Sequence, residues 1–311
     1  MKKQTTRLRE LIKAGPTLFV PGCYNAMSAR VIENAGFPAI YMSGYGTSLS
    51  LTGLPDAGLV TMTEVITNAR YIAQAVNVPV IADADNGYGN ALNVIRTVRE
   101  FIAAGIAGIH LEDQVSPKRC GHVAGRLVVP LEEAVGKMRA ADATRKELDP
   151  DFLLIARTDA RGASGGSLDE AIRRANALLA AGADMAFVEG PTSVEEVRRV
   201  CTEIEGPIFY NMTGVSPRYS LEEMKALGMA ITIAPGALMR VSLTAMHDLA
   251  VQMRDEGPMA EARFFEKFRS HPLGDLHTFA GFDRIRAWEK EFLGEEAMQK
   301  YANSVGHMPK K

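Results

Sequence analysis

Residues 80–122 read VIADADNGYGNALNVIRTVREFIAAGIAGIHLEDQVSPKRCGH, and this stretch decides the fold. Two short apolar runs, Val80–Ala82 and Ala107–Leu111, each end on carboxylates. Between them, Ala91–Ala104 has the composition of a helix and is followed by a glycine, a residue that commonly ends helices. Such a strand–helix–strand unit makes the two strands parallel neighbours, with their carboxyl ends at one edge of the sheet. We therefore expect a parallel sheet with acidic side chains gathered on one rim.

The same alternation of short apolar runs and helical segments extends along most of the chain. The runs are continuously apolar, which is typical of strands covered on both faces. Eight strand–helix units favour an α/β fold of the (β/α)8 barrel type, forming a single domain over 1–311 with 258–311 as a helical C-terminal extension. The glycine- and serine-rich segment 43–59 is expected to be a long connection. An open doubly wound sheet is the alternative, but no G-x-G-x-x-G follows the first strand.

Composition narrows the class of protein. The chain has 311 residues, a formal net charge of −2 and 47% hydrophobic residues, so it can bury a large core and has no basic surplus for nucleic acid or an anionic membrane. Its basic N-terminus lacks the apolar core of a signal peptide, and no apolar run is long enough to span a bilayer. Three widely spaced cysteines do not form a disulfide framework. We expect a cytoplasmic protein.

The carboxylates at the strand ends predict a metal site. Asp83 and Asp85 follow one strand, and Glu112 occupies the equivalent place on the next. Asp56, in a turn of the preceding loop, could reach the same edge. Carboxylates at strand ends also serve as helix caps and loop ion pairs, so the first pair alone leaves both interpretations open. Glu112 favours a cation, and oxygen-only ligands suit Mg²⁺ or Mn²⁺.

Cys120 lies in a polar loop, between Lys118-Arg119 and His122. Such neighbours lower the pKa of a thiol and make it a usable proton donor or nucleophile, although a free cysteine is also commonly a buried packing residue. Arg157 ends another apolar strand, where burial without a partner would be costly. It should therefore meet a protein carboxylate, an anionic substrate or both.

These motifs together resemble a known family. The KRCGH motif at 118–122 closely resembles the signature of the isocitrate lyase and phosphoenolpyruvate mutase superfamily, in its 2-methylisocitrate lyase branch. Further motifs that match are YMSG at 41–44, GLPD at 53–56, DAD at 83–85, LEDQ at 111–114 and ARTD at 156–159. The resemblance covers roughly residues 18–250. It implies a (β/α)8 barrel whose last helix is exchanged between paired subunits, usually assembled as a homotetramer.

The resemblance also implies roles for individual residues. Asp83 would be the direct Mg²⁺ ligand, with Asp56, Asp85 and Glu112 acting mostly through water. The residues that would bind the substrate are Ser43, Gly44, Tyr45, Gly121, His122, Arg157, Glu189 and Asn211. In lyase members a C–C bond beside a hydroxyl is cleaved, giving an α-keto acid such as pyruvate and a carboxylic acid. Tyr41 would accept the hydroxyl proton, and Cys120 would protonate the departing carbanion.

Two departures bear on the substrate. Tyr45 follows Gly44, where the family often has a second glycine, and residues 211–217 read NMTGVSP, shorter than in the methylisocitrate branch and without its glutamate. A substrate smaller than 2-methylisocitrate, of the 2,3-dimethylmalate type, or oxaloacetate therefore fits the pattern. Oxaloacetate hydrolysis or decarboxylation and a phosphonopyruvate mutase or hydrolase are the alternatives. Cys120 argues against C–P chemistry, and the intact motifs argue against a catalytically silent relative.

Overall fold

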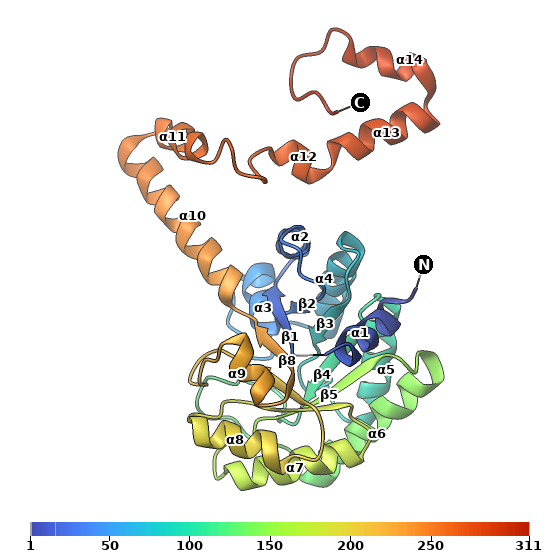
Figure 1. Ribbon diagram of the computed structural model, residues 1–311, viewed down its shortest axis with the longest axis vertical. Helices are drawn as coiled ribbons and strands as arrows, with labels where there is room; N and C mark the ends of the chain where they lie inside the picture. Colours follow the sequence, from blue (N-terminus) through green and yellow to red (C-terminus); the bar gives the residue numbers. More distant parts are fainter. Residues whose placement is uncertain (1, 16, 311) are drawn as a thin grey trace. The chain divides into compact units, whose positions relative to one another are not determined.

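The computed structural model describes residues 2–15 and 17–310, and over these residues eight strands form a closed parallel barrel (Figure 1). The strands are β1 (Leu18–Cys23), β2 (Ile40–Met42), β3 (Val80–Asp83), β4 (Gly108–Glu112), β5 (Leu153–Thr158), β6 (Met185–Val188), β7 (Ile208–Asn211) and β8 (Met229–Ala234). Each strand pairs with its sequence neighbour, and β1 closes the barrel against β8, with Leu18 opposite Ile231. The predicted (β/α)8 barrel is confirmed.

Helices precede, alternate with and follow the strands (Figure 1). The helices up to the last strand are α1 (Gln4–Lys13), α2 (Ala26–Asn34), α3 (Gly44–Thr52), α4 (Met62–Ala75), α5 (Ala91–Ala103), α6 (Leu131–Leu148), α7 (Leu168–Ala180), α8 (Val194–Glu203) and α9 (Leu221–Ala226). After β8 come α10 (Ala237–Glu256), α11 (Met259–Lys267), α12 (Leu276–Ala280), α13 (Phe282–Phe292) and α14 (Gly294–Met298).

The segment 43–59 differs from the expected connection, because it contains α3. The Ser43 side chain accepts a hydrogen bond from the Gly46 N–H and so caps the helix. The helix ends at Gly53, whose φ of 70° is a left-handed conformation that glycine adopts at little cost. Glycine- and serine-rich composition hid this helix, since both residues are poor helix formers in general but good caps.

The inside of the barrel and its amino-terminal end share one apolar cluster. Phe187 and Phe209 pack with the inward side chains of the other strands, and Leu8 of α1 is fully buried in the same cluster. Arg9 of α1 pairs with Asp184, just before β6, at 2.9 Å. Helix α1 therefore closes the amino-terminal end of the barrel and leaves the carboxyl-terminal rim for chemistry.

Polar residues stand at that rim as the sequence predicts. They are Ser43 after β2, Asp83 at the end of β3, Glu112 at the end of β4, Arg157 in β5, Glu189 after β6 and Asn211 at the end of β7. All are buried.

The chain divides into two compact units, Met1–Val241 and Ser242–Lys311. The boundary between these units lies within α10, and the single domain with an extension from 258 stays a prediction. The aromatic-rich tail is helical, as predicted, in α11 and α13. No helix in the described ranges is long and apolar enough to cross a membrane.

Candidate active site

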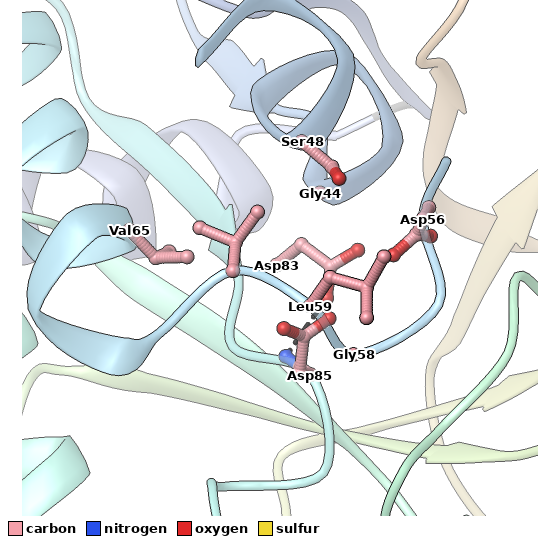
Figure 2. A pocket seen from close by; sticks show the side chains of 9 residues that line it. Gly44, Ser48, Asp56, Gly58, Leu59, Val65, Asp83 and Asp85 are labelled. Carbon is pink, nitrogen blue, oxygen red and sulfur yellow. Dashed lines mark hydrogen bonds between the residues drawn. The ribbon is translucent and has the colours of Figure 1, made fainter. Parts of the chain in front are cut away.

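Three of the four predicted metal-binding carboxylates line one small cavity at the rim. Asp83 and Asp85, from β3 and the turn after it, and Asp56, from the loop before α4, face this cavity below Gly44 (Figure 2). Its volume is about 10 Å³, which is space for about one water molecule. A Cβ at Gly44 would collide with the Asp83 carboxylate, so any larger residue there would displace this carboxylate.

Lys118 neutralises part of this cluster. Its Nζ lies 2.5 Å from Asp56 Oδ1 and 2.6 Å from Asp85 Oδ1, and its side chain is only 4% exposed. Burial would lower the Lys118 pKa, but the surrounding carboxylates raise it well above its ordinary value. The ammonium is therefore a fixed positive charge among acids, and the lysine that sequence reasoning treated only as a neighbour of Cys120 belongs to the carboxylate cluster.

The carboxylates differ in how readily they ionise. Burial raises the pKa of Asp85 to about 6, although Lys118 opposes the shift. Burial would also raise the pKa of Asp83, but His110, Lys118 and other neighbours outweigh it and lower the pKa to about 2. Asp83 therefore has the lower pKa of the two aspartates and is ionised at neutral pH, as a direct cation ligand needs to be.

Glu112 is held differently from the aspartates. Burial raises its pKa well above the ordinary value, although Arg157 opposes the shift. Arg157 Nε lies 3.3 Å from Glu112 Oε2, yet neither carboxylate oxygen accepts a hydrogen bond from a described residue. Two buried acceptors without donors carry a free-energy cost, and a bound cation or its water would remove that cost.

Arg157 sits at the centre of an ion-pair network. Its Nε and Nη2 donate to Asp159 Oδ2 and Oδ1 at 2.9 and 3.1 Å, and its Nη2 lies 3.5 Å from Glu189 Oε2. Glu189 in turn accepts a hydrogen bond from Asn211 Nδ2 at 3.2 Å. Of the two partners expected for Arg157, the structure shows the protein carboxylates. Asp159 belongs to the ARTD motif at 156–159, but the sequence did not predict that it orients Arg157.

The loop between β4 and α6 carries Cys120 to the same rim. The Cys120 N–H donates to the Asp56 carbonyl at 3.0 Å, and Gln114 holds the backbone of Arg119 through two hydrogen bonds of 2.8 and 3.0 Å. A Cβ at Gly121 would collide with the Arg157 guanidinium. Cys120 and the Arg157 network are therefore brought together as predicted.

His122 joins the loop to the end of β7. Its Nε2 is 3.0 Å from Thr213 Oγ1 and 3.4 Å from Asn211 Nδ2. The same nitrogen lies 3.5 Å from Glu189 Oε1. The polar residues expected on the far side of the pocket thus contact one another directly.

The expected lowering of the Cys120 pKa is wrong. Burial raises the pKa of this thiol above its ordinary value of 9.0, and the hydrogen bond from the His122 backbone only partly opposes it. Lys118 points to the aspartates, and the Arg119 side chain reaches the Ala124 carbonyl. The thiol is consequently protonated at neutral pH, which suits a proton donor better than a nucleophile.

Tyr41 and His110 form a buried pair inside the barrel mouth. Tyr41 Oη lies 2.7 Å from His110 Nε2, and the side chains are nearly parallel, with ring centroids 5.8 Å apart. Burial raises the pKa of Tyr41 well above its ordinary value and lowers that of His110 to about 4. Both groups are therefore neutral near pH 7, and His110 Nε2 also lies 3.7 Å from Asp83 Oδ1.

Comparison with known proteins decides the family. The model of the phosphoenolpyruvate phosphomutase family matches residues 8–254. A 2,3-dimethylmalate lyase of Eubacterium barkeri is 48% identical over 91% of this chain and 94% of its own length. The chain belongs to the phosphoenolpyruvate mutase and isocitrate lyase superfamily. It is therefore an enzyme of the lyase and mutase class.

Two solved structures of the superfamily carry different chemistries. An oxaloacetate acetylhydrolase bound to 3,3-difluorooxaloacetate is 34% identical, with a TM-score of 0.83 over 94% of this chain and 98% of that one. A phosphonopyruvate hydrolase complexed with oxalate and Mg²⁺ is 30% identical, with a TM-score of 0.81 over 94% of this chain and all of that one. The superfamily thus combines one barrel with small carboxylate ligands and, in at least that member, with Mg²⁺.

The donor set of this superfamily member fits a magnesium ion. The acids supply only oxygen, and Glu112 has buried oxygens without hydrogen bonds. Over residues 2–15 and 17–310, no three His, Cys, Asp or Glu side chains stand close enough to ligate one ion together. Mg²⁺ commonly keeps several waters and takes one or two carboxylates directly, so a site built on Asp83 needs no such trio. The Lys118 ammonium occupies the space between two of the remaining acids.

Not every predicted residue contacts this cluster. Ser43 is engaged as the cap of α3, and Tyr45 on the same helix is 41% exposed. Sequence reasoning missed His110, although it lies inside the quoted stretch, because a histidine in an apolar strand resembles an ordinary core residue. It also missed Arg126, which the structure joins to Asp159. No sequence motif indicated the contact between Arg126 and Asp159.

Proposed function

We propose that this enzyme is a Mg²⁺-dependent carbon–carbon lyase that cleaves a 2-hydroxy dicarboxylate or tricarboxylate into an α-keto acid and a carboxylic acid. The observation that carries the proposal is the partly buried Cys120 thiol, with its raised pKa, on a rim that also holds Arg157 and the acidic cluster. A lyase of this kind needs a proton donor for a carbanion, beside charges that bind carboxylates.

The proposed reaction needs one residue that accepts a proton and another that donates one. The substrate hydroxyl gives its proton to Tyr41 Oη while Tyr41 passes its own phenol proton along the 2.7 Å hydrogen bond to His110 Nε2, so His110 holds the extra proton. The C–C bond then breaks, its electron pair stays on the departing carbon, and the Cys120 S–H protonates that carbon. One proton enters at Tyr41 and one leaves at Cys120, so a proton must return between the two sites before the next turnover.

The remaining residues bind and orient the substrate. Arg157 would pair with a substrate carboxylate while Asp159 keeps its guanidinium in place, and Asn211 and His122 would hold the distal half. Asp83 would ligate Mg²⁺ directly, with Asp56, Asp85 and Glu112 through water. Bound Mg²⁺ would supply positive charge to the oxygens of the α-keto acid. Mn²⁺ has similar ligand preferences.

A substrate of the 2,3-dimethylmalate type is favoured over 2-methylisocitrate. The support is the 48% identity with a 2,3-dimethylmalate lyase and the short 211–217 segment. The exposed Tyr45 at the start of α3 adds bulk next to Gly44. Pyruvate and propionate are the products that such a substrate would give.

The test is release of α-keto acid from a panel of substrates in the presence of Mg²⁺. The panel is 2,3-dimethylmalate, 2-methylisocitrate, isocitrate, oxaloacetate and phosphonopyruvate. We expect 2,3-dimethylmalate to be cleaved fastest and EDTA to abolish the reaction. An Asp83→Asn variant should not respond to Mg²⁺. Turnover of phosphonopyruvate alone, or full activity in EDTA, would refute the proposal.

Oxaloacetate hydrolysis is the second candidate. It is favoured by the likeness to the oxaloacetate acetylhydrolase and by the short segment after Asn211. In that reaction water attacks the keto carbon, and the carbanion that leaves is again protonated. Oxalate and acetate as the only products would establish this alternative.

The proposed setting is the cytoplasm, and the proposed assembly is a homotetramer of helix-exchanged dimers. The proposed assembly is supported by α10, because none of its residues is buried within the described chain. Val241 and Met246 of α10 are 65% and 60% exposed. Apolar side chains on a long uncovered helix favour burial against another subunit. Light scattering of the purified protein would test the mass, and a monomer would contradict it.

A further inference from the structure

Arg126 lies in the loop that carries Cys120, six residues after it, and its side chain is almost fully buried. Its Nη1 donates to Asp159 Oδ1 at 3.1 Å and to the Gly121 carbonyl. Asp159 Oδ1 also accepts a hydrogen bond from Arg157 Nη2 at 3.1 Å. One carboxylate oxygen therefore joins the substrate-binding arginine to the arginine of the cysteine loop.

The next loop is shaped around this side chain. Gly162, after β5, has no side chain, and a Cβ there would collide with the Arg126 guanidinium. The Ser164 N–H donates to the Arg126 carbonyl at 3.0 Å. Two loops from different strands thus enclose Arg126, and the space for its head group depends on a glycine.

The contact is not an obvious gain in stability. Arg126 Nε is buried and donates no hydrogen bond to any described residue, which costs free energy. Asp159 already accepts two hydrogen bonds from Arg157, so Arg126 is not needed to hold this carboxylate in place. A buried cation kept under these conditions indicates a task in placing something else.

We infer that Arg126 is a positioning residue that fixes Cys120 over the reacting carbon. The Gly121 carbonyl that it binds is one peptide unit from Cys120, whose own N–H is held by the Asp56 carbonyl at 3.0 Å. The backbone of Cys120 is therefore anchored on both sides, through Asp56 to the acidic cluster and through Arg126 to Arg157. The catalytic consequence rests on the proposed function, whereas the anchoring itself does not.

This dual anchoring couples the proton donor to the substrate-binding group. A displacement of Arg157 would also move Asp159, because the two side chains are hydrogen-bonded. It would then move Arg126, which binds the same oxygen of Asp159, and the Gly121 carbonyl that Arg126 holds. Proton transfer to carbon depends steeply on the donor–acceptor distance, and a misplacement of about 1 Å can cost about 10²-fold in rate. Arg126 would thus keep the Cys120 thiol at a fixed position relative to the substrate carboxylate bound at Arg157.

The experiment compares Arg126→Met with Arg126→Lys, which keeps the charge, and with Gly162→Ala, which crowds the guanidinium from the other loop. The control is Arg161→Gln, which removes a nearby arginine whose ion pair with Glu196 is partly exposed. The readout is the rate of iodoacetamide labelling at Cys120, measured by mass spectrometry on the full chain. Cys201 in α8 is partly buried and far along the sequence, and it serves as the internal reference.

We expect Arg126→Met and Gly162→Ala to raise Cys120 labelling about tenfold or more while Cys201 labelling stays within about twofold, as local opening predicts. Arg126→Lys should be intermediate, and Arg161→Gln should resemble the parent. With a cleaved substrate, kcat should fall more than KM rises, because the donor and not the binding contacts is displaced.

Unchanged Cys120 labelling in both Arg126→Met and Gly162→Ala would overturn the inference. An equal rise at Cys120 and Cys201 would do the same, because it would show general loosening of the fold. Labelling needs no substrate, so the result stands apart from the proposed function: a parent enzyme that cleaves nothing on the panel refutes the lyase assignment and leaves the positioning test intact.

Discussion

Replacing Tyr41 by phenylalanine removes one oxygen from a buried pair and separates the catalytic from the structural role of that group. The Tyr41 hydroxyl is the hydrogen-bond partner of His110 Nε2 at 2.7 Å, and His110 is completely buried. Its other ring nitrogen, Nδ1, has no hydrogen bond among the described residues. In Tyr41→Phe, neither nitrogen of the buried imidazole would have a hydrogen-bond partner.

The expected costs follow from these contacts. Leaving one buried polar atom without a partner lowers the free energy of unfolding by about 1–3 kcal/mol. Loss of a positioned proton acceptor lowers kcat by about 10²- to 10⁴-fold. That fall corresponds to about 3–5 kcal/mol in the activation free energy. KM should change little, because the carboxylate contacts at Arg157 remain.

The assay pairs steady-state kinetics with urea unfolding. Tyr210→Phe is the matched control, since Tyr210 is also a buried phenol with a 2.6 Å hydrogen bond, donated to the Pro217 carbonyl outside the barrel interior. The control should lose similar stability and keep kcat within about threefold. A Tyr41→Phe enzyme with kcat within about threefold of the parent would refute the assignment of Tyr41 as proton acceptor.

Three further outcomes are expected. Gly121→Ala should lower kcat/KM about 10²-fold or more, because its Cβ would push the Arg157 guanidinium aside; unchanged kinetics would contradict the tight packing of that loop. Iodoacetamide labelling of Cys120 should be slower than that of free cysteine at pH 8 and still rise above pH 9.0, because the raised pKa keeps the thiol protonated; a plateau below pH 8 would mean a thiolate. Asn25→Ala should lower the free energy of unfolding by about 1 kcal/mol with kcat unchanged, because it removes the capping box of α2, and no change in the urea midpoint would count against that cap.

The fold was predictable because its signals are local and repeated. Continuous apolar strands, glycine-closed helices and polar residues at strand ends recur around the barrel, and each repeat reinforces the same register. Helix α3 was not predictable from composition, since its cap Ser43 and its terminal Gly53 look like loop residues until the backbone is seen.

The site was predictable in its parts and not in its contacts. The acids after β3 and β4 and the loop cysteine are chemically conspicuous in the sequence. The sign of the Cys120 shift depends on where the neighbouring cations point, and Lys118 turns away to the aspartates. The contact of Arg126 with Asp159 joins residues 33 positions apart, and no pattern in the sequence encodes such pairing.

Single-turnover cleavage by Cys120→Ser, with Mg²⁺ saturating and the best substrate of the panel, tests whether Cys120 is the proton donor. We expect α-keto acid release to fall about 10³-fold or more, because serine is a far weaker acid toward carbon. The variant should bind the α-keto acid product as the parent does, measured by calorimetry. It should also bind Mn²⁺ as the parent does, measured by electron paramagnetic resonance. Cleavage within about tenfold of the parent rate would rule out Cys120 as the proton donor, since the carbanion would then take its proton from another group.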